Sequence, residues 1–317
     1  MEKNSRIFIA GHRGLVGGAL TRDLESKGYQ GLITRTRQEL DLCDQADVQA
    51  FFEKEKPEYV FLAAAKVGGI LANSTFGGDF IRENLQIQIN IIDAAYRAGV
   101  KRLLFLGSSC IYPKMAPQPM KEDYLLTGPL EPTNQPYAVA KIAGIEMCWA
   151  YNRQYGTQYI AAMPTNLYGP GDNYDLNNSH VLPALIRKMH EAKEADAKSV
   201  EIWGSGTPKR EFLYNEDLAD ACVYLMNLPD SEYQKLLVDD TPPLINIGVG
   251  EDLSIAELAA LVAKVVGFDG ELVYDASKPD GTPRKLMDVS KLNNLGWKAN
   301  TGLEDGIGQA YAHWLNS

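Results

Sequence analysis

The first half of the chain alternates short, almost continuous hydrophobic runs with longer stretches in which hydrophobic positions recur every three or four residues. Continuous runs of this kind are typical of strands buried on both faces of a parallel sheet. They lie at 6–10, 31–34, 59–65, 102–108 and 159–165. The periodic stretches between them predict helices at 15–27, 46–56, 79–98 and 137–155. We therefore predict the α/β fold class, with a doubly wound parallel sheet that binds ligands at the carboxyl ends of its strands.

The pattern changes after the fifth predicted strand. The segment 166–179, NLYGPGDNYDLNNS, is rich in Asn, Gly, Asp and Pro, and it predicts a loop that leaves the sheet. Beyond it the pattern predicts a helix at 181–195, a strand at 200–204, a helix at 215–228 and a buried strand at 244–250. Because this last strand returns to the sheet, we expect two domains built from separate segments. The first comprises 1–170 and about 215–250, and the smaller α/β domain comprises about 171–214 and 251–317.

Composition places the chain among ordinary globular proteins. Hydrophobic residues make up 45% and charged residues 23% of its 317 positions. No run of 18 apolar residues occurs and the first residues lack the apolar core of a signal peptide, so we expect a cytoplasmic protein with no membrane partner. The cysteines are Cys43, Cys110, Cys148 and Cys222; their spacing matches no metal site, and we expect reduced thiols and no metal. A formal net charge of −10 disfavours nucleic acid as a partner but leaves room for a small anion held by local cations.

A glycine-rich turn, GHRGLVG, directly follows the first predicted strand. Its glycines, Gly11, Gly14 and Gly17, let the turn tighten and let backbone N–H groups approach a pyrophosphate at the start of the next helix. A glycine triplet alone is equally compatible with an ordinary strand-to-helix turn. Its place at the first strand of an alternating pattern favours a dinucleotide site of the Rossmann type. The predicted contacts of this turn are Gly11, His12, Arg13, Gly14, Leu15, Val16 and Gly17.

The end of the second predicted strand indicates which dinucleotide binds. An NAD site usually has a carboxylate there for the ribose 2′-hydroxyl, whereas this chain reads ITRTRQE, with Arg35 and Arg37. Guanidinium groups suit a 2′-phosphate, so we predict NADPH/NADP+ as the cofactor. Any one of these arginines alone could be a solvated surface charge. Together with Arg13 in the glycine turn they favour a functional role, and we select Arg13 and Arg37 over Arg35.

The segment NQPYAVAKIAGIE carries the candidate proton donor. Asn134 is a predicted N-cap, and Tyr137 and Lys141 stand four residues apart on one helical face. A tyrosine, whose ordinary pKa is about 10, needs a nearby positive charge to exchange protons near neutral pH. Lys141 supplies that charge, and the Ser108 hydroxyl at the end of the fourth strand can hydrogen-bond to a substrate carbonyl. A Tyr/Lys pair alone is common, but this combination is not.

These motifs resemble the extended short-chain dehydrogenase/reductase family. GHRGLVG, GSSCIYP, YAVAK and NLYGPGDN stand in the order and spacing of that family. The segments AAAKVGGI, EPTNQPYAVAKIAGI, PTNLYGPGDN, WGSGTPKREFL and DASKPDGTPRK further resemble its branch that acts on GDP-4-keto sugars. With the glycine turn, the resemblance covers nearly the whole chain. It implies an NADPH-dependent enzyme with GDP-4-keto-6-deoxy-D-mannose as the substrate.

The resemblance implies two chemistries at one site. Reduction of the C4 ketone needs a hydride and a proton, with Tyr137 as the donor and Lys141 and Ser108 in support. Epimerisation at C3 and C5 needs a separate acid/base pair, and the resemblance implies Cys110 as the base and His180 as the acid. A thiol with an ordinary pKa of about 8.5 and an imidazole of about 6.5 are both suited to proton transfer near neutrality. Without the resemblance, a buried structural cysteine and a surface histidine would be equally compatible with the sequence.

The resemblance also implies the remaining contacts. Besides the glycine turn and Arg37, the cofactor would contact Leu106, Gly107, Ser108, Ser109, Lys141, Pro164, Thr165, Asn166, Leu167 and His180. The GDP-sugar would contact Lys188, Trp203, Arg210 and Asp280. Trp203 offers a stacking face and Arg210 a bidentate grip on phosphate, although a buried aromatic is the commoner role for a tryptophan.

Two alternatives remain open. One is another extended reductase, 4-epimerase or dehydratase of a nucleotide sugar; Cys110 with His180 argues against it, as do arginines suited to NADP. The other is a non-catalytic NADP sensor, which could dispense with Ser108, Tyr137 and Lys141. The family resemblance also implies a homodimer with a four-helix interface formed by 79–98 and 137–155.

Overall fold

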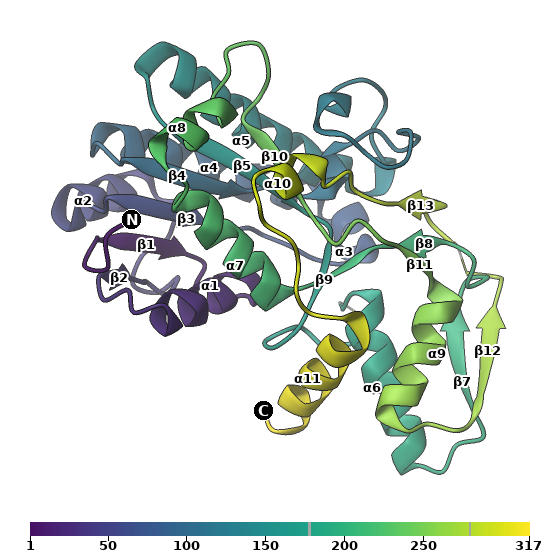
Figure 1. Cartoon of the computed structure of the whole chain (residues 1–317). Coiled ribbons are helices and arrows are strands. Elements are labelled where there is room, and N and C mark those ends of the chain that lie inside the picture. The colour runs from purple at the N-terminus through teal and green to yellow at the C-terminus, as the bar shows by residue number, and fades with distance from the viewer. Residues whose placement is uncertain (177–178, 279) are drawn as a thin grey trace.

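The computed structural model describes residues 1–176, 179–278 and 280–317. Within these residues a six-stranded parallel sheet has the strand order β10-β5-β4-β3-β1-β2 (Figure 1). Its strands are β1 (Ile7–Ala10), β2 (Leu32–Ile33), β3 (Tyr59–Leu62), β4 (Arg102–Leu106), β5 (Tyr159–Pro164) and β10 (Leu244–Ile247). The parallel sheet and the late return of the chain to its edge at β10 confirm the predicted fold class.

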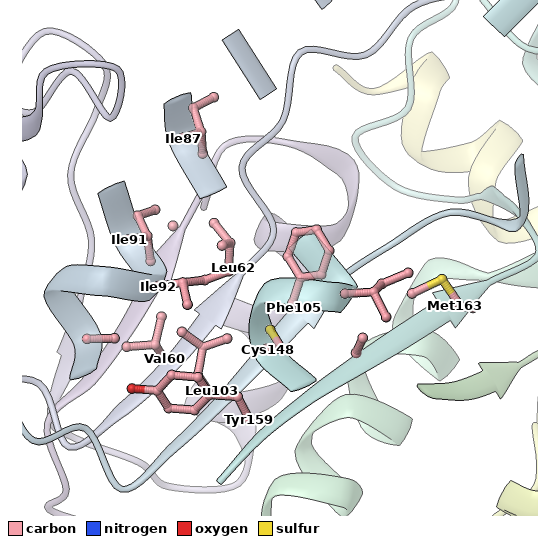
Figure 2. Packing of buried hydrophobic residues seen from close by; sticks show 14 of the residues in the cluster. Val60, Leu62, Ile87, Ile91, Ile92, Leu103, Phe105, Cys148, Tyr159 and Met163 are labelled. Carbon is pink, nitrogen blue, oxygen red and sulfur yellow. The ribbon is translucent and has the colours of Figure 1, made fainter. Parts of the chain in front are cut away.

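Helices cover both faces of this sheet because its strands are apolar on both sides. The helices α1 (Leu15–Ser26) and α7 (Asn215–Met226) cover one face, and α2 (Gln45–Glu55), α4 (Gly77–Arg97) and α5 (Gln135–Tyr155) cover the other. Successive strand residues alternate between the two cores. In β3, Val60 and Leu62 join the core under α4 and α5, whereas Phe61 joins the core under α1 and α7. Figure 2 shows the first of these cores, with Ile87 and Ile91 of α4 beside the strand residues.

The predicted helix ends lie within two residues of the observed ones, and local residues explain several of them. Asp44 caps α2, because its side chain accepts hydrogen bonds from the N–H groups of Ala46 and Asp47. Gly156 ends α5 with a φ of 68°, in the left-handed region that glycine adopts at little cost. Asn134 holds the N-cap position of α5 as predicted, but its side chain makes no capping bond and its Oδ1 is buried without a partner. The preceding 3₁₀ turn places Asn134 at φ −127° and ψ 15°, away from the extended conformation of a capping residue.

The second part of the chain has its own core. The parallel strands β7 (Ser199–Trp203) and β12 (Glu271–Asp275) pack with three helices, α6 (Val181–Glu194), α9 (Ile255–Val266) and α11 (Leu303–Leu315). A capping box of Ser254 and Glu257 begins α9. The sequence pattern predicted α6 and β7 but not α9, β12 or α11.

Short strands connect the two parts. β6 (Asn166–Tyr168) pairs with β9 (Phe212–Tyr214), and β8 (Lys209–Arg210) lies between β11 (Leu253–Ser254) and β13 (Arg284–Lys285). The other short elements include α3 (Ile70–Thr75), α8 (Asp230–Tyr233), α10 (Ser290–Asn294) and the 3₁₀ turns Ser109–Ile111, Glu122–Tyr124, Pro132–Asn134 and Gln234–Leu236.

The segment 286–299 bears on the two-domain division. Met287 and Val289 lie in the core under α4 and α5, and Leu292 and Trp297 lie in the core under α1 and α7. We therefore propose the two domains predicted from the sequence, with this segment moved to the first. Among the described residues, no helix is both long enough and apolar enough to cross a membrane.

Candidate active site

A cavity of about 610 Å³ opens where the strands of the large sheet end, a volume suited to a small-molecule ligand. Its lining includes most of the residues selected from the sequence. They are Gly11, Gly14, Leu15, Val16, Gly17, Arg37, Leu106, Gly107, Ser108, Ser109, Tyr137, Lys141, Pro164, Thr165, Asn166, Leu167 and His180. His12, Arg13 and Cys110 are not part of the lining.

Three stretches of this lining were not predicted from the sequence. They are 40–43, 63–67 and the pair Glu83 and Ile87 on α4. The run 63–67 directly follows β3, so its place at the end of a parallel strand was a usable signal. The other two come from a loop and a helix face, and no motif identified them.

The glycine turn is shaped for close backbone approach. Gly11 has a φ of +90°, and a Cβ there would lie 2.8 Å from the backbone of Ala64. A Cβ on Gly17 would lie 2.1 Å from the carbonyl oxygen of Gly11, so this turn tolerates no side chain at either position. Gly14, the N-cap of α1, provides no side-chain cap for the first N–H groups of the helix. An uncapped helix start facing the cavity fits a pyrophosphate.

The three arginines near the predicted 2′-phosphate differ in their partners. Arg35 is bound to Glu55 at 2.8 Å and to the carbonyl oxygen of Thr34. Arg37 is exposed and lies 3.9 Å from a Glu83 oxygen, a loose contact. Arg13 is exposed and forms no ion pair within the described part of the chain. Arg35 and Arg37 line the cavity and Arg13 does not. We propose Arg13 and Arg37 as groups for a 2′-phosphate because neither is held by a close ion pair among the described residues.

Lys141 lies one turn after Tyr137 on α5 and is buried. Its Nζ donates a 2.7 Å hydrogen bond to the carbonyl oxygen of Leu106 and lies 5.8 Å from the centre of the Tyr137 ring. Burial lowers the pKa of Lys141 to about 8, because a low-dielectric site disfavours the ammonium form. The lysine therefore still carries its charge at neutral pH while sitting close to the tyrosine.

Ser108 connects the tyrosine and the cysteine. Its side chain caps the 3₁₀ turn Ser109–Ile111, and its hydroxyl oxygen accepts the N–H of Cys110 at 3.5 Å. Burial raises the pKa of Tyr137 and of Cys110, and in each case the nearby Ser108 hydroxyl opposes the shift. Both groups are therefore protonated at neutral pH. Ser108 therefore lies next to the candidate proton donor of the reduction, Tyr137, and next to the candidate base of the epimerisation, Cys110.

Cys110 and His180 occupy different surroundings. Cys110 is 7% exposed, and the charges that favour its thiolate are those of Lys285 and Lys141. His180 stands at the N-cap of α6, on the lining of the cavity; desolvation by the surrounding protein lowers its pKa, although the residue as a whole is exposed. Among the described residues the two side chains form no hydrogen bond with each other.

The candidate phosphate ligand Arg210 has a cationic neighbour. Arg210 of β8 is the register partner of Lys285 of β13. Burial lowers the pKa of both side chains; at Lys285 the nearby Cys110 opposes this shift, and the charge of Arg210 adds to it. Lys285 ends the segment DASKPDGTPRK but was not selected, because its proximity to Arg210 and Cys110 depends on strand pairing between distant segments.

Trp203 lies at the end of β7 with 61% of its surface exposed. The Nζ atoms of Lys188 and Lys278 lie 5.2 Å and 5.4 Å from its ring centre. Asp280 lies beside the following turn, where it accepts hydrogen bonds from the N–H and the hydroxyl of Ser205 at 2.7 Å and 2.8 Å. The structure thus groups Trp203, Lys188 and Asp280 on one surface, and it adds Lys278.

A larger cavity, of about 710 Å³, lies elsewhere and contains none of the candidate residues. Its lining mixes acidic, basic and apolar side chains, among them Lys121, Glu122, Asp123, Leu125, Leu126 and Trp149. We assign the chemistry to the 610 Å³ cavity because it brings together the hydroxyls, the lysine and the imidazole. In the described ranges, no three His, Cys, Asp or Glu side chains are grouped to hold a metal ion.

Comparison with known proteins gives consistent relatives. GDP-L-fucose synthase 1 of Arabidopsis thaliana is 57% identical over 316 residues, with 100% of this chain and 95% of the relative covered. GDP-L-fucose synthase of Escherichia coli is 55% identical over 315 residues, with 98% and 97% covered. A solved GDP-D-glycero-L-gluco-heptose synthase of Campylobacter jejuni, determined in the presence of NADPH, has a TM-score of 0.90 and 42% identity, with 100% and 99% covered.

A family model covers the part of the chain that carries the large sheet and the glycine turn. The match extends over residues 7–248, from β1 to the end of β10. It includes Ser108, Tyr137 and Lys141 as well as β8. With this match and the full-length relatives, the chain belongs to the NAD dependent epimerase/dehydratase family.

Proposed function

We propose that the protein converts GDP-4-keto-6-deoxy-D-mannose to GDP-L-fucose with NADPH, the reaction of the relatives named GDP-L-fucose synthase. The observation that carries this proposal is the position of Ser108: its hydroxyl oxygen accepts the N–H of Cys110, and the hydroxyl lies near enough to the Tyr137 phenol and the Cys110 thiol to oppose the rise of both pKa values. One hydroxyl placed between a candidate proton donor and a candidate proton acceptor suits an enzyme that epimerises and reduces the same sugar.

The reduction uses Tyr137 as the proton donor, with Ser108 and Lys141 beside it. NADPH, when bound, supplies a hydride to C4 of the sugar. Tyr137 donates the proton that the new C4 alkoxide needs, and it is protonated at rest because burial raises its pKa. The nearby Lys141 ammonium stabilises the phenolate that remains. Ser108 donates a hydrogen bond to the C4 oxygen, which aligns the carbonyl.

The epimerisation uses Cys110 and His180 as the acid/base pair. C3 and C5 are each bonded to the C4 carbonyl carbon, so removal of either proton leaves an enolate that the Ser108 and Tyr137 hydroxyls stabilise at the C4 oxygen. The Cys110 thiolate takes the proton, and the His180 imidazolium returns one to the opposite face of the same carbon. The two side chains then exchange a proton with solvent before the next step, so no net charge accumulates. Lys285 and Lys141 favour the thiolate that this cycle needs.

The substrate's nucleotide lies along the second part of the chain. Trp203 presents an exposed ring on which a guanine can stack, and Lys188 is a nearby cation. Arg210 binds the diphosphate, and Asp280 accepts hydrogen bonds from hydroxyl groups. These assignments rest on the grouping of the side chains around β7, β8 and the segment 280–285.

A second candidate is the reduction of another GDP-4-keto sugar. It is favoured by the 42% identity to a structure named as a GDP-heptose synthase. The pair of Cys110 and His180 does not separate the two candidates, because either sugar can require epimerisation. The sugar itself must therefore be varied in the experiment.

The deciding test is an assay of NADPH oxidation by absorbance. The purified protein is mixed with NADPH and either GDP-4-keto-6-deoxy-D-mannose, a GDP-4-keto-heptose or a UDP-sugar. We expect oxidation with the first, and a product that co-elutes with GDP-L-fucose. Turnover of the heptose alone would support the second candidate, and turnover of the UDP-sugar alone would contradict both.

We also propose that two copies pair through α4 and α5 into a four-helix interface, in the cytoplasm. The outer surfaces of these helices carry exposed apolar side chains, Ile89, Tyr96, Val139 and Tyr155. Tyr96 and Tyr155 stack with ring centres 4.3 Å apart, which joins the two helices into one surface.

A further inference from the structure

Glu211 is a fully buried carboxylate between β8 and β9. Its Oε1 accepts the N–H groups of Val249 and Gly250 at 2.6 Å and 2.7 Å, and its Oε2 accepts the N–H of Met287 at 2.9 Å. Neither the predicted site residues nor the proposed mechanism gives this side chain a role. In the described part of the chain it forms no ion pair.

The same residue also contacts the part of the cavity lining that follows β5. Its backbone carbonyl oxygen accepts hydrogen bonds from the Asn166 Nδ2 at 2.8 Å and from the Thr165 hydroxyl at 3.3 Å. Thr165 and Asn166 line the cavity directly after β5. Glu211 is therefore bonded to the sheet end, to the loop after β10 and to the segment after β13.

The packing around the carboxylate leaves little freedom. A Cβ on Gly248 would lie 2.2 Å from the Glu211 Oε1, so this glycine lets the loop after β10 close over the carboxylate. Burial of a carboxylate without a cation is costly, and burial raises the pKa of Glu211 although three N–H groups oppose the shift. A neutral side chain would avoid that cost. A functional reason for this cost would be that the three hydrogen bonds accepted by Glu211 position residues of the candidate site.

The bond to Met287 fixes β13. Met287 follows Lys285 by two residues, and Lys285 is the register partner of Arg210. Because side chains alternate along a strand, Glu211 directed into the core is consistent with Arg210 directed to the other side. Glu211 thus anchors two short strands: β8, which it directly follows in the chain, and β13, through its hydrogen bond to Met287.

We propose that Glu211 is a positioning residue for the diphosphate of the GDP-sugar, which holds Arg210 and Lys285 in register so that both cations face the same anion. This inference rests on the proposed function, because it takes the substrate's nucleotide to lie at Arg210. A carboxylate that only stabilises the fold would have no specific effect on GDP binding, whereas this role of Glu211 predicts one.

The test compares Glu211→Gln with a matched control, Asp217→Asn. Asp217 is also buried and also accepts backbone N–H groups, those of Asn300 and Thr301 at 3.2 Å and 2.8 Å, but it lies in the first turn of α7 and is not part of the cavity lining. In Glu211→Gln the new amide N–H₂ must face an N–H donor, because both carboxylate oxygens accept backbone N–H groups. In Asp217→Asn it can face the Thr301 hydroxyl, which can turn to accept, while the remaining oxygen keeps both backbone bonds. Both proteins should lose thermal stability.

The ligands are GDP, measured by calorimetry, and NADPH, measured by fluorescence, at a temperature where circular dichroism shows all proteins folded. We expect GDP to bind about tenfold more weakly to Glu211→Gln and within about twofold of wild type to Asp217→Asn. NADPH affinity should stay within about twofold in both. If Glu211→Gln does not fold, Glu211→Asp gives the same comparison, because its shorter side chain keeps the charge but cannot reach all three N–H groups.

Equal GDP affinity in Glu211→Gln and wild type would overturn the inference. A parallel loss of GDP and NADPH affinity would also overturn it, in favour of general loosening of the cavity. A wild-type protein that binds no GDP would contradict the proposed function itself, before any variant is compared, and this inference would fall with it.

Discussion

The Nζ of Lys141 lies 5.8 Å from the centre of the Tyr137 ring while its hydrogen bond to the Leu106 carbonyl oxygen holds it in place. The ammonium group is thus close enough to stabilise the phenolate, and it is buried enough to titrate near physiological pH. Burial lowers its pKa from 10.5 to about 8. This pairing makes the reduction step sensitive to alkaline pH.

We therefore predict that kcat for NADPH oxidation falls as pH rises through about 8. Below that pH Lys141 carries its proton and its charge; above it the charge that stabilises the Tyr137 phenolate is lost. In Lys141→Arg the guanidinium stays charged, so the residual activity should keep its level to higher pH. An identical pH profile in wild type and Lys141→Arg would rule out Lys141 as the group that titrates.

The epimerisation has a different expected pH profile. Burial raises the pKa of the base Cys110 and lowers that of the acid His180, so the reactive thiolate and imidazolium forms are both minor forms between the two values. Their joint population is then constant with pH and falls only below the His180 pKa or above the Cys110 pKa. We predict a plateau of deuterium incorporation at C3 and C5 in D₂O that is wider than the interval from about 6.5 to about 8.5, which a solvent-exposed imidazole and thiol would give. A narrow maximum inside that interval would contradict this ordering.

Replacement of the thiol tests its role directly. Cys110→Ser should reduce deuterium incorporation at C3 and C5 by about 10² to 10⁴, the usual contribution of a general base, with NADPH affinity unchanged. Cys148→Ser is the control, because Cys148 is a buried thiol in the core under α4 and α5. Normal exchange in Cys110→Ser would make this cysteine a structural residue.

Cofactor choice depends on the free arginines. We predict that Arg13→Ala with Arg37→Ala weakens NADPH binding at least about tenfold and NADH binding by less than about threefold, because only NADPH carries the 2′-phosphate. Arg35→Ala should leave the preference for NADPH intact, since Arg35 is bound to Glu55. Fluorescence titration with both cofactors measures the ratio. Equal losses for NADPH and NADH in the double variant would disprove this assignment.

The phenol of Tyr112, in the same motif as Cys110, has a structural partner. Its hydroxyl donates a 2.6 Å hydrogen bond to the Oδ1 of buried Asn246, whose Nδ2 donates to the carbonyl oxygens of Met120 and Asp288. Tyr112→Phe leaves that Oδ1 without its donor and should lower the free energy of unfolding by about 1–3 kcal/mol. Tyr159→Phe should be neutral or stabilising, because the Tyr159 hydroxyl is buried and has no partner among the described residues. Denaturant titration measures both, and equal losses would refute this account of Tyr112.

The proposed dimer can be broken at α4. Ile89 is 47% exposed on this helix, and Ile89→Glu would bury a charge in the four-helix interface. We predict a monomer for Ile89→Glu and a dimer for Val273→Glu, which changes a similarly exposed residue on β12. Light scattering after size exclusion measures the mass. A dimeric Ile89→Glu would exclude this interface.

Features that depend on neighbouring positions in the chain could be predicted from the sequence. Tyr137 and Lys141 stand one helical turn apart, and the glycine turn follows a strand, so local spacing located both. The buried strands were equally visible, because a sheet covered on both faces has no polar positions to interrupt its hydrophobic runs.

Features that depend on pairing between distant segments could not be predicted. Lys285 acquires its place from the register of β13 with β8, and Glu211 from bonds to three separate segments. The partner of Arg35, Glu55, is the last residue of α2, whereas Arg35 lies in the loop after β2, so only the structure shows which arginine is free. In each case the residue could be read from the sequence, but its contact with a residue far along the chain could not.

The exposed indole of Trp203, with the Nζ atoms of Lys188 and Lys278 5.2 Å and 5.4 Å from its ring centre, gives this protein an optical reporter at the proposed substrate surface. A purine that stacks on the ring would shield it from water and displace the ammonium groups, and both changes alter indole emission. Occupancy of the nucleotide surface should therefore be visible in the native fluorescence, independently of cofactor turnover and without any attached dye.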